Sequence, residues 1–420
     1  MFDIITIGSA TVDVFAYTDS SEIIKIKSST SEQDFIAYNS GEKIIITDLD
    51  FEIGGGGTNT AVSFSRLGLK TAYLGKIGSD ENASKVLELL KKENISFIGA
   101  RGEKTGYSIV LNSFEHDRTI LTYKGANNDL VDSDIVLSNL QTKWFYASSM
   151  IGNSFDTLKS IISVIKKTGA KVAFNPSSYQ AKRGLSELAI VLKQLDVLVL
   201  NKEEAQLLLN EKTNITNDLV KKLALLGPKY VVITDGAKGV TCYYDQTIYY
   251  LPASKDVKVV ETTGAGDAFA SAFVAGLAYL FSVEDSLKLG LIQAESVISA
   301  VGAKNNLLFR DDALNQLKVF NRPIQISKTI DEEYIKNTFV APKGKEFVLQ
   351  NNQKISDLNE LGNSLRTMQD DVFKYHTQSK NHFSLWIKDV FNLTTLSEKL
   401  NLIKSKLEMS DVILEYIKQN

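Results

Sequence analysis

Short apolar runs alternate with longer amphipathic segments along this chain, and from residue 144 onward the alternation becomes regular. Apolar runs that predict buried strands lie at residues 144–147, 171–174, 197–200 and 230–234. Segments with helical periodicity accompany them at residues 155–167, 186–194, 203–209 and 218–226. This alternation predicts parallel strands joined by crossover helices, and therefore a layered α/β sheet. Two longer helices are predicted at residues 264–280 and 283–301.

The N-terminal part of the chain follows a less regular pattern. Strands are predicted at residues 3–7 and 71–76, and helices at residues 60–67 and 82–92. Residues 16–50 are polar and irregular with short alternating stretches, which indicates a flap of short strands rather than a core element. Period-two alternation predicts two further short strands at residues 108–112 and 119–124.

The composition of the chain shifts near residues 321–323. After about residue 331 the chain is nearly free of glycine and rich in Lys, Asn, Leu and Phe. Amphipathic helices are predicted there at residues 354–361, 382–391 and 396–407. The sequence therefore predicts two domains, a large one over residues 1–325 and a small helical one over residues 331–420.

The overall composition is that of a globular protein. The 420 residues are 44% hydrophobic and 23% charged, and the formal net charge of −3 gives no general attraction for nucleic acid or anionic membranes. No run reaches the roughly 18 uninterrupted apolar residues of a membrane span, and the N-terminus lacks the pattern of a signal peptide. We therefore expect the cytoplasm.

Cysteine and histidine offer no metal-binding pattern. The single cysteine, Cys242, excludes an intramolecular disulfide, as is typical of a reducing compartment, and its apolar surroundings predict a buried strand residue. The three histidines are scattered without metal-ligand spacing. His376 and His382 stand six residues apart and are expected to be packing or surface residues, although they could meet.

The strongest chemical signal is the segment Glu261-Thr262-Thr263-Gly264-Ala265-Gly266-Asp267, which leads into a predicted helix. A Gly-Ala-Gly start leaves backbone N–H groups without partners at the positive end of the helix dipole, which suits phosphate oxygens. A carboxylate beside them, Asp267, can accept a proton from an attacking hydroxyl group. On residue type alone, Asp267 would more often cap its helix.

A second signal is the run Gly54-Gly55-Gly56-Gly57-Thr58-Asn59, which precedes a predicted helix. Consecutive glycines allow the backbone to approach a ligand closely, and Asn59 can both donate to and accept from a sugar hydroxyl. A flexible surface loop is the alternative. The run has neither the spacing of a dinucleotide-binding fingerprint nor the Gly-Lys-Ser/Thr of a P-loop.

Together these two motifs resemble the signature pair of the ribokinase family, the PfkB carbohydrate kinases, and the resemblance extends over about residues 3–322. It implies a three-layer α/β/α sandwich of the ribokinase-like type, with a small β-sheet lid formed by about residues 12–50 and 104–125. A mainly helical C-terminal domain of unknown function would follow. The resemblance also implies an ATP-dependent kinase with Mg²⁺ that phosphorylates a primary hydroxyl group of a sugar or sugar derivative.

The resemblance implies a role for each matching residue. Asp267 would be the catalytic base, next to an anion hole formed by Gly264, Ala265 and Gly266. The expected substrate-binding residues are Asp13, Gly55, Gly56 and Asn59. The expected nucleotide-binding residues are Asn201, Glu204, Thr234, Gly236 and Gly239, of which Glu204 would hold Mg²⁺ through water. On residue type alone, Asn201 would be a helix cap, Thr234 and Gly236 a turn, and Asp13 a partner in a salt bridge.

The chain departs from the family pattern at three positions. Glu261 stands where members commonly carry Asp, near the monovalent-cation site of some relatives, so the sequence leaves the need for such a cation undecided. Gly56 replaces a lysine that is usual in ribokinases proper, and Thr11 replaces an asparagine. These two changes argue against ribose as the specific acceptor.

Two other functions stay open at this point. A nucleoside kinase would use the same machinery with a larger subpocket for the base, and a non-catalytic sugar-sensing protein would keep the fold without turnover. A homodimer through the lid is expected from the resemblance, and the C-terminal domain is expected to contact a partner of unknown kind. No partner among nucleic acids or membranes is expected.

Overall fold

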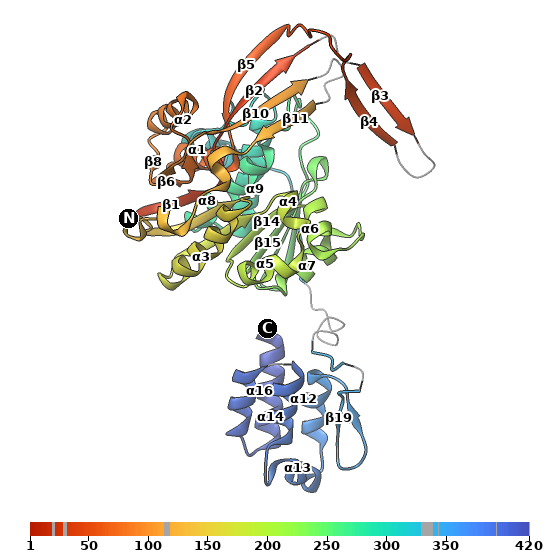
Figure 1. Ribbon diagram of the computed structural model, residues 1–420. Coiled ribbons are helices and arrows are strands. Elements are labelled where there is room, and N and C mark those ends of the chain that lie inside the picture. The colour runs from red at the N-terminus through yellow and green to blue at the C-terminus, as the bar shows by residue number, and fades with distance from the viewer. Residues whose placement is uncertain are drawn as a thin grey trace. The chain divides into compact units, whose positions relative to one another are not determined.

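The computed structural model describes residues 1–18, 22–27, 32–112, 118–328, 339–342, 344–391 and 393–419. The chain divides into two compact units, Met1–Lys328 and Thr329–Asn420, and Figure 1 shows each of them. Residues 113–117, which connect the two strands predicted at 108–112 and 119–124, lie outside the described residues. Among the described helices, none combines the length and the apolarity that crossing a bilayer takes.

A ten-stranded sheet forms the middle layer of the larger unit as far as the structure describes it. Its strand order is β18–β17–β16–β15–β14–β13–β12–β1–β6–β8. The strands from β15 to β8 are parallel to their neighbours, whereas β16, β17 and β18 run antiparallel. In chain order the strands are β1 (Phe2–Ile7), β6 (Thr71–Leu74), β8 (Ser96–Phe97), β12 (Thr142–Ser148), β13 (Lys171–Asn175), β14 (Val197–Asn201), β15 (Tyr230–Thr234), β16 (Val240–Tyr244), β17 (Thr247–Leu251) and β18 (Gln325–Lys328).

Helices cover both faces of this sheet. One face packs against α3 (Asn153–Lys167), α5 (Leu185–Leu192), α6 (Lys202–Leu209) and α7 (Thr216–Ala224), and the short α4 (Ser178–Ala181) adjoins α6. The other face packs against α1 (Gly56–Arg66), α8 (Ala265–Ala278), α9 (Val283–Val297) and α10 (Arg310–Val319). Alternation of side chains explains the two cores, because Ile5 points into the first and Ile4 into the second. The predicted three-layer α/β/α class is thereby confirmed.

A second, smaller sheet forms the lid. Its order is β11–β10–β2–β5, with β2 (Thr11–Tyr17), β5 (Asp48–Gly54), β10 (Gly106–Asn112) and β11 (Arg118–Tyr123). The hairpin of β3 (Glu22–Lys27) and β4 (Glu32–Ala37) also lies within the predicted flap. A short parallel pair, β7 (Lys76–Ile77) and β9 (Ala100–Arg101), and α2 (Glu81–Lys92) complete the unit.

Several predicted boundaries differ from the structure, and α1 differs most. The helix begins at Gly56, inside the glycine run, rather than at Thr60. The hydroxyl group of Thr58 donates to the carbonyl of Gly54, and that of Thr60 donates to Gly56. Glycine has low helix propensity, but burial of almost the whole helix against β1 and α8 overrides it. The alternative of a flexible surface loop is therefore wrong for this part of the run.

The smaller unit is mainly helical and has its own core. It contains α12 (Leu358–Thr367), α13 (Asp370–Thr377), α14 (His382–Phe391), α15 (Thr394–Asn401) and α16 (Lys406–Gln419), and a small hairpin of β19 (Phe347–Val348) and β20 (Lys354–Ile355). The helix predicted at 354–361 is wrong at its start, because α12 is capped by Asp357, which accepts from the backbone N–H of Glu360. The single helix predicted at 396–407 is wrong too, since α15 ends at Asn401 and a new helix, α16, begins at Lys406.

His376 and His382 meet within this unit, which was the less expected alternative, and His376 is at the same time a buried packing residue. Their Nδ1 atoms lie 3.3 Å apart, and His376 is only 4% exposed among aromatic side chains. Nε2 of His376 accepts the backbone N–H of Gln350 at 3.0 Å. Neutral His376 therefore carries its proton on Nδ1 and donates it to His382. This arrangement disfavours a metal ion between the rings, because a metal would need that same Nδ1 lone pair.

We expect acid to destabilise the smaller unit. Burial, and to a smaller extent the neighbouring His382, lowers the pKa of His376 below its ordinary value. His376 therefore binds a proton more readily in the unfolded chain than in the folded unit. The free energy of unfolding should therefore fall as the pH decreases below about 6.5. The chain has two tryptophans, so a Trp144→Phe substitution leaves Trp386, in the smaller unit, as the sole tryptophan. Urea unfolding followed by its fluorescence then measures the stability of this unit.

A His376→Phe variant provides the control for that measurement. It leaves the N–H of Gln350 without an acceptor, so it should cost about 1–3 kcal/mol at pH 7.5. Its stability should then vary less between pH 7.5 and pH 5 than that of the parent protein. An unchanged pH dependence in the variant would rule out the histidine pair as its origin.

Candidate functional site

The carboxyl ends of the parallel strands meet at one edge of the large sheet, where ligands collect in α/β proteins. A cavity of about 220 Å³ opens there. Strands β13, β14 and β15 contribute residues that include Asn175, Asn201 and Thr234, and the start of α8 contributes Gly264, Gly266 and Asp267. Glu204 from the first turn of α6 also lines the cavity. Six of the predicted site residues thus share one cavity.

Asp267 occupies the first turn of α8, and its carboxylate is held by another helix. Nδ2 of Asn59, on α1, donates to Oδ2 of Asp267 at 2.8 Å. Burial raises the pKa of Asp267 above its ordinary value, while the hydrogen bond from Asn59 and the charge of Lys304 oppose this rise. The prediction that Asn59 and Asp267 belong to one site therefore agrees with their direct contact across 208 residues of sequence.

The start of α8 has the features of an anion-binding helix terminus. Gly264 adopts φ = 81°, which favours glycine, and it precedes the first helical residue. Among the described residues, no carbonyl or side chain accepts a hydrogen bond from the backbone N–H of Gly266 or Asp267. A Cβ atom at Gly266 would meet no atom within 4 Å. Unpaired amides beside open space can hold phosphate oxygens. Ala265, between Gly264 and Gly266, does not line the cavity, and its N–H donates to the carbonyl oxygen of Thr262 at 3.3 Å.

Asn201 and Glu204 form a reciprocal cap at the start of α6. Oδ1 of Asn201 accepts from the backbone N–H of Glu204 at 2.8 Å, and Oε2 of Glu204 accepts from that of Asn201 at 3.0 Å. Burial raises the pKa of Glu204, and the neighbouring charges of Glu203 and Asp267 add to this effect. Both side chains nevertheless line the cavity, so the capping and ligand-binding interpretations are compatible.

The loop after β15 contributes unequally to the site. Thr234, the last residue of the strand, lines the cavity, whereas Gly236 and Gly239 do not. Gly239 has φ = 102°, and a Cβ atom there would lie 2.2 Å from the carbonyl oxygen of Leu251. This glycine therefore permits the tight connection to β16, which is a structural reason for its residue type.

The glycine run brings the backbone of α1 close to the same site. Gly55 has φ = 95°, and a Cβ atom there would lie 2.4 Å from the carbonyl oxygen of Ser9. A Cβ atom at Gly56 would lie 3.5 Å from Oδ1 of Asp267 and 3.1 Å from Oγ of Ser148. A lysine at position 56 would therefore project its side chain into the space between these two groups.

Asp13 lies on the lid strand β2, opposite Glu52 of β5 and Ser108 of β10. Among the described side chains, three buried oxygens near the site have no hydrogen-bond partner, those of Asp13 (Oδ1), Tyr146 and Ser148. Buried polar atoms without partners are rare in native proteins and often await a ligand. A polyhydroxylated acceptor fits this set, since its hydroxyl groups both donate and accept.

A divalent cation fits this site only with help from a ligand. Within the described part of the chain, no three His, Cys, Asp or Glu side chains gather closely enough to hold a metal ion. Mg²⁺ commonly keeps several waters and binds through one or two carboxylates together with substrate phosphates. Glu204 suits that indirect role. Glu261 accepts from the backbone N–H of Gly302 at 2.9 Å and contacts the hydroxyl of Thr263, so its carboxylate joins two loops.

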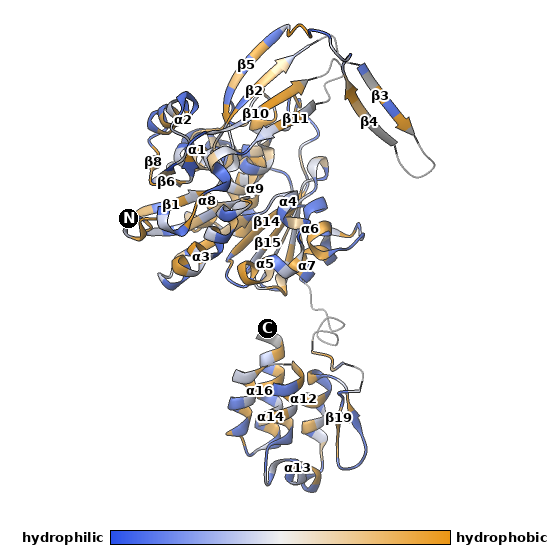
Figure 2. Cartoon of the chain, viewed as in Figure 1, coloured by the Kyte–Doolittle hydropathy of each residue, from blue (hydrophilic) through white to orange (hydrophobic). Residues whose placement is uncertain are grey.

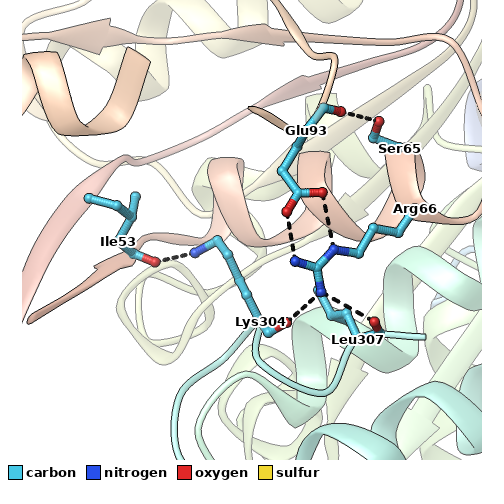
Figure 3. A network of polar contacts seen from close by, with 6 residues as sticks. All are labelled: Ile53, Ser65, Arg66, Glu93, Lys304 and Leu307. Carbon is cyan, nitrogen blue, oxygen red and sulfur yellow. Dashed lines mark hydrogen bonds and ion pairs between the residues drawn. The ribbon is translucent and has the colours of Figure 1, made fainter. Parts of the chain in front are cut away.

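Sequence analysis missed Lys304, which is buried beside the site. Its ammonium group contacts the carbonyl oxygen of Ile53 and Oδ1 of Asn59. Arg66 donates to the carbonyls of Lys304 and Leu307 and pairs with Glu93, as Figure 3 shows. A lone lysine in a polar loop has no pattern that distinguishes it from a solvated charge. No signal in one sequence could have found it.

Comparison with known proteins places the larger unit among carbohydrate kinases. The family model described as "pfkB family carbohydrate kinase" matches residues 1–309. An uncharacterized sugar kinase of Archaeoglobus fulgidus is 29% identical over 253 residues, which are 59% of this chain and 98% of that relative. A ribokinase of Staphylococcus aureus is 31% identical over 249 residues, which are 56% of this chain and 79% of that enzyme.

Solved structures share the fold of this unit. Ribokinase of Arabidopsis thaliana, complexed with ribose and ATP, has a TM-score of 0.65 at 21% identity, covering 76% of this chain and 99% of its own. A nucleoside kinase of Burkholderia thailandensis, in complex with inosine, has a TM-score of 0.61 at 15% identity, covering 76% of this chain and 100% of its own. At these identities the likeness concerns the fold.

Two glycines at the start of α8 should respond differently to alanine. In Gly264→Ala the new Cβ would lie 2.5 Å from Cβ of Ala303 at positive φ, so we expect a loss of about 1–3 kcal/mol in unfolding free energy. Gly266→Ala should keep the parent stability, because its Cβ meets no atom, yet it should weaken ATP binding by intruding on the cavity. Chemical denaturation and titration calorimetry measure the two effects. Equal stability losses would contradict this assignment.

Proposed function

Because this chain belongs to the PfkB family of carbohydrate kinases, we propose that it transfers the γ-phosphoryl group of ATP to a primary hydroxyl group of a sugar or sugar derivative. One observation carries the proposal. The carboxylate of Asp267 lies at the start of α8, where Asn59 donates a hydrogen bond to it. The backbone N–H groups of Gly266 and Asp267 beside it donate to no acceptor among the described residues. A base and an anion hole in this proximity suit phosphoryl transfer.

In the proposed reaction, Asp267 takes the proton of the acceptor hydroxyl group. A bond forms between that oxygen and the γ-phosphorus, the bond from phosphorus to the β–γ bridging oxygen breaks, and ADP leaves. The segment Gly264-Ala265-Gly266 is proposed to stabilise the charge on the transferred group, chiefly through the unpaired N–H of Gly266 together with that of Asp267, because the N–H of Ala265 donates to Thr262. The raised pKa of Asp267 places this base nearer to neutral pH, where it accepts a proton more readily than an ordinary aspartate does.

ATP and Mg²⁺ would lie along the cavity. Asn201, Thr234 and Glu204 line it and are proposed to hold the phosphates and, through water, the cation. The cation would supply charge neutralisation at the phosphate oxygens. Gly236 and Gly239 are proposed to shape the loop on the nucleotide side.

The acceptor is proposed to bind between the lid and α1. Asp13 would accept hydrogen bonds from hydroxyl groups of the sugar, and Asn59 would orient the sugar, while Gly55 and Gly56 allow the backbone to approach it. The cytoplasm remains the predicted compartment, as the single buried Cys242 suits a reducing environment. The unit Thr329–Asn420 lies outside this assignment, and a partner for it remains a prediction.

The proposed activity is tested by ADP formation from ATP and Mg²⁺ with a panel of sugars, sugar derivatives and nucleosides. We expect turnover with one class of acceptor, and a loss of about 10²-fold or more in kcat for Asp267→Asn, because the amide cannot take the proton. ATP binding by the variant, measured by calorimetry, serves as the control for folding. Turnover with nucleosides alone would replace the sugar acceptor, and ATP binding without any turnover would favour a sugar-sensing protein.

We also propose that the lid mediates a homodimer. Strand register places Phe51 of β5 on the same face as Leu121 of β11, opposite the face that carries Asp13, and both are more than half exposed. Figure 2 shows hydrophobic residues recurring along these strands. Large exposed apolar side chains on one sheet face are typical of an interface.

Sedimentation velocity tests the homodimer. We expect the parent protein to sediment as a dimer and a Phe51→Glu/Leu121→Glu variant as a monomer, because two charges would be buried without partners. Val319→Glu is the matched control, since Val319 is an exposed apolar residue of α10. A monomeric parent protein would refute the proposal.

A further inference from the structure

A buried lysine with two oxygen partners joins the lid to the proposed catalytic base. Lys304 is 6% exposed, and its ammonium group contacts the main-chain carbonyl of Ile53, on the lid strand β5. The same group contacts Oδ1 of Asn59, which is 7% exposed. Nδ2 of Asn59 in turn donates to Asp267. Three side chains from three segments thus form one continuous hydrogen-bonded chain.

An ammonium group has three donors and no acceptor, so it determines which end of the Asn59 amide faces it. The amide oxygen must point toward Lys304, and the amide N–H must therefore point toward Asp267. This orientation suits a charged carboxylate, which accepts hydrogen bonds. It disfavours a protonated Asp267, whose O–H would need an acceptor at that place.

The backbone of the loop that carries Lys304 is held independently of its side chain. Arg66 donates to the carbonyl oxygens of Lys304 at 2.8 Å and of Leu307 at 3.2 Å, and its guanidinium group pairs with Glu93 at 2.6 Å. The next residue, Asn305, reaches Glu52 of the lid at 3.0 Å. These contacts hold the loop in place without a buried charge at position 304.

We propose that Lys304 is a positioning residue for the phosphoryl transfer proposed above: it fixes the Asn59 amide so that its N–H faces Asp267 and keeps this base unprotonated. The inference rests on the proposed function in so far as Asp267 is the base. Without the ammonium group the amide can rotate, and its oxygen then accepts from a protonated Asp267. Loss of Lys304 should therefore favour the protonated, inactive form of the base.

The charges around Lys304 agree with this role. Burial lowers the pKa of Lys304 to about 8, and the carboxylates of Asp13, Asp267 and Glu52 oppose that effect, whereas Arg66 adds to it. The side chain is therefore still charged at neutral pH. The groups that bear on Asp267 are Asn59 and Lys304, and Asp267 itself acts on the titration of Tyr146 and Glu204.

The pH profile of kcat/KM distinguishes positioning from a merely structural role. In Lys304→Met we expect the acid limb to move up by about one pH unit, because the carboxylate loses both the neighbouring charge and the fixed N–H donor. A shift of one pH unit should lower kcat/KM by about tenfold at pH values below the acid limb, and by less at higher pH. Lys304→Gln, whose amide can still donate to Asn59, should shift the limb less.

Two controls accompany this profile. Asn305→Ala removes a contact between the same loop and the lid without reaching Asn59, so its acid limb should coincide with that of the parent protein. In an Asn59→Ala background, Lys304→Met should shift the acid limb less than it does in the parent protein, because only the effect of the ammonium charge remains once the amide is absent. An equal shift in Asn305→Ala, or an unshifted limb in Lys304→Met, would overturn the proposal.

A direct titration keeps this test independent of the acceptor. Selective ¹³C labelling of aspartate carboxyl groups allows the Asp267 resonance to be assigned by its loss in Asp267→Asn. Its titration should move to higher pH in Lys304→Met without any substrate present. If the parent protein shows no phosphoryl transfer but this shift occurs, the proposed function fails while the role of Lys304 stands. An unshifted resonance refutes that role, whether or not the protein is active.

Discussion

The hydrogen bond between Asn59 and Asp267 is the contact on which the site depends, because it joins the N-termini of two helices that pack on the same face of the sheet. Each helix is preceded by a glycine, Gly55 or Gly264, for a steric reason: the backbone there has positive φ and passes close to a neighbouring segment. Both helix starts can therefore approach the carboxyl edge of the sheet, and the two side chains meet there. The cavity, the open amides and the lid contact all lie around this pair.

The buried polar side chains behind the site fix its geometry at a cost in conformational entropy. Buried lysine, arginine and asparagine side chains lose rotamer freedom and hydration, and such groups persist when every donor finds an acceptor. Arg66 illustrates this rule, since Glu93 and two carbonyl groups satisfy its guanidinium group on three sides. The site is thus held by a polar network behind it as well as by the apolar cores on both sides of the sheet.

Much of the fold could be predicted from the sequence because it follows from periodicity, and the rest depends on tertiary contacts. The parallel strands were visible as apolar runs, whereas β18 is exposed along its length and shows no such run. Motif residues such as Asn201, Thr234 and Asp267 could be predicted to line one site because each follows a strand or opens a helix. The role of Lys304 could not be predicted, because its partner Asn59 lies far away in the sequence. The contact between His376 and His382 could not be predicted either, because it depends on packing within a neighbouring aromatic cluster.

The antiparallel strand β18 has a consequence for where the larger unit can be cut. It is the last strand of that unit, and it covers the hydrogen-bonding edge of β17 over four residue pairs. The family match ends at residue 309, before this strand begins. A chain shortened to that limit would lose α10 as well as β18, and it would leave β17 as a bare sheet edge, which can recruit strands from other molecules. The solubility of an isolated kinase unit would therefore depend on a short, unremarkable strand that lies beyond every recognisable motif.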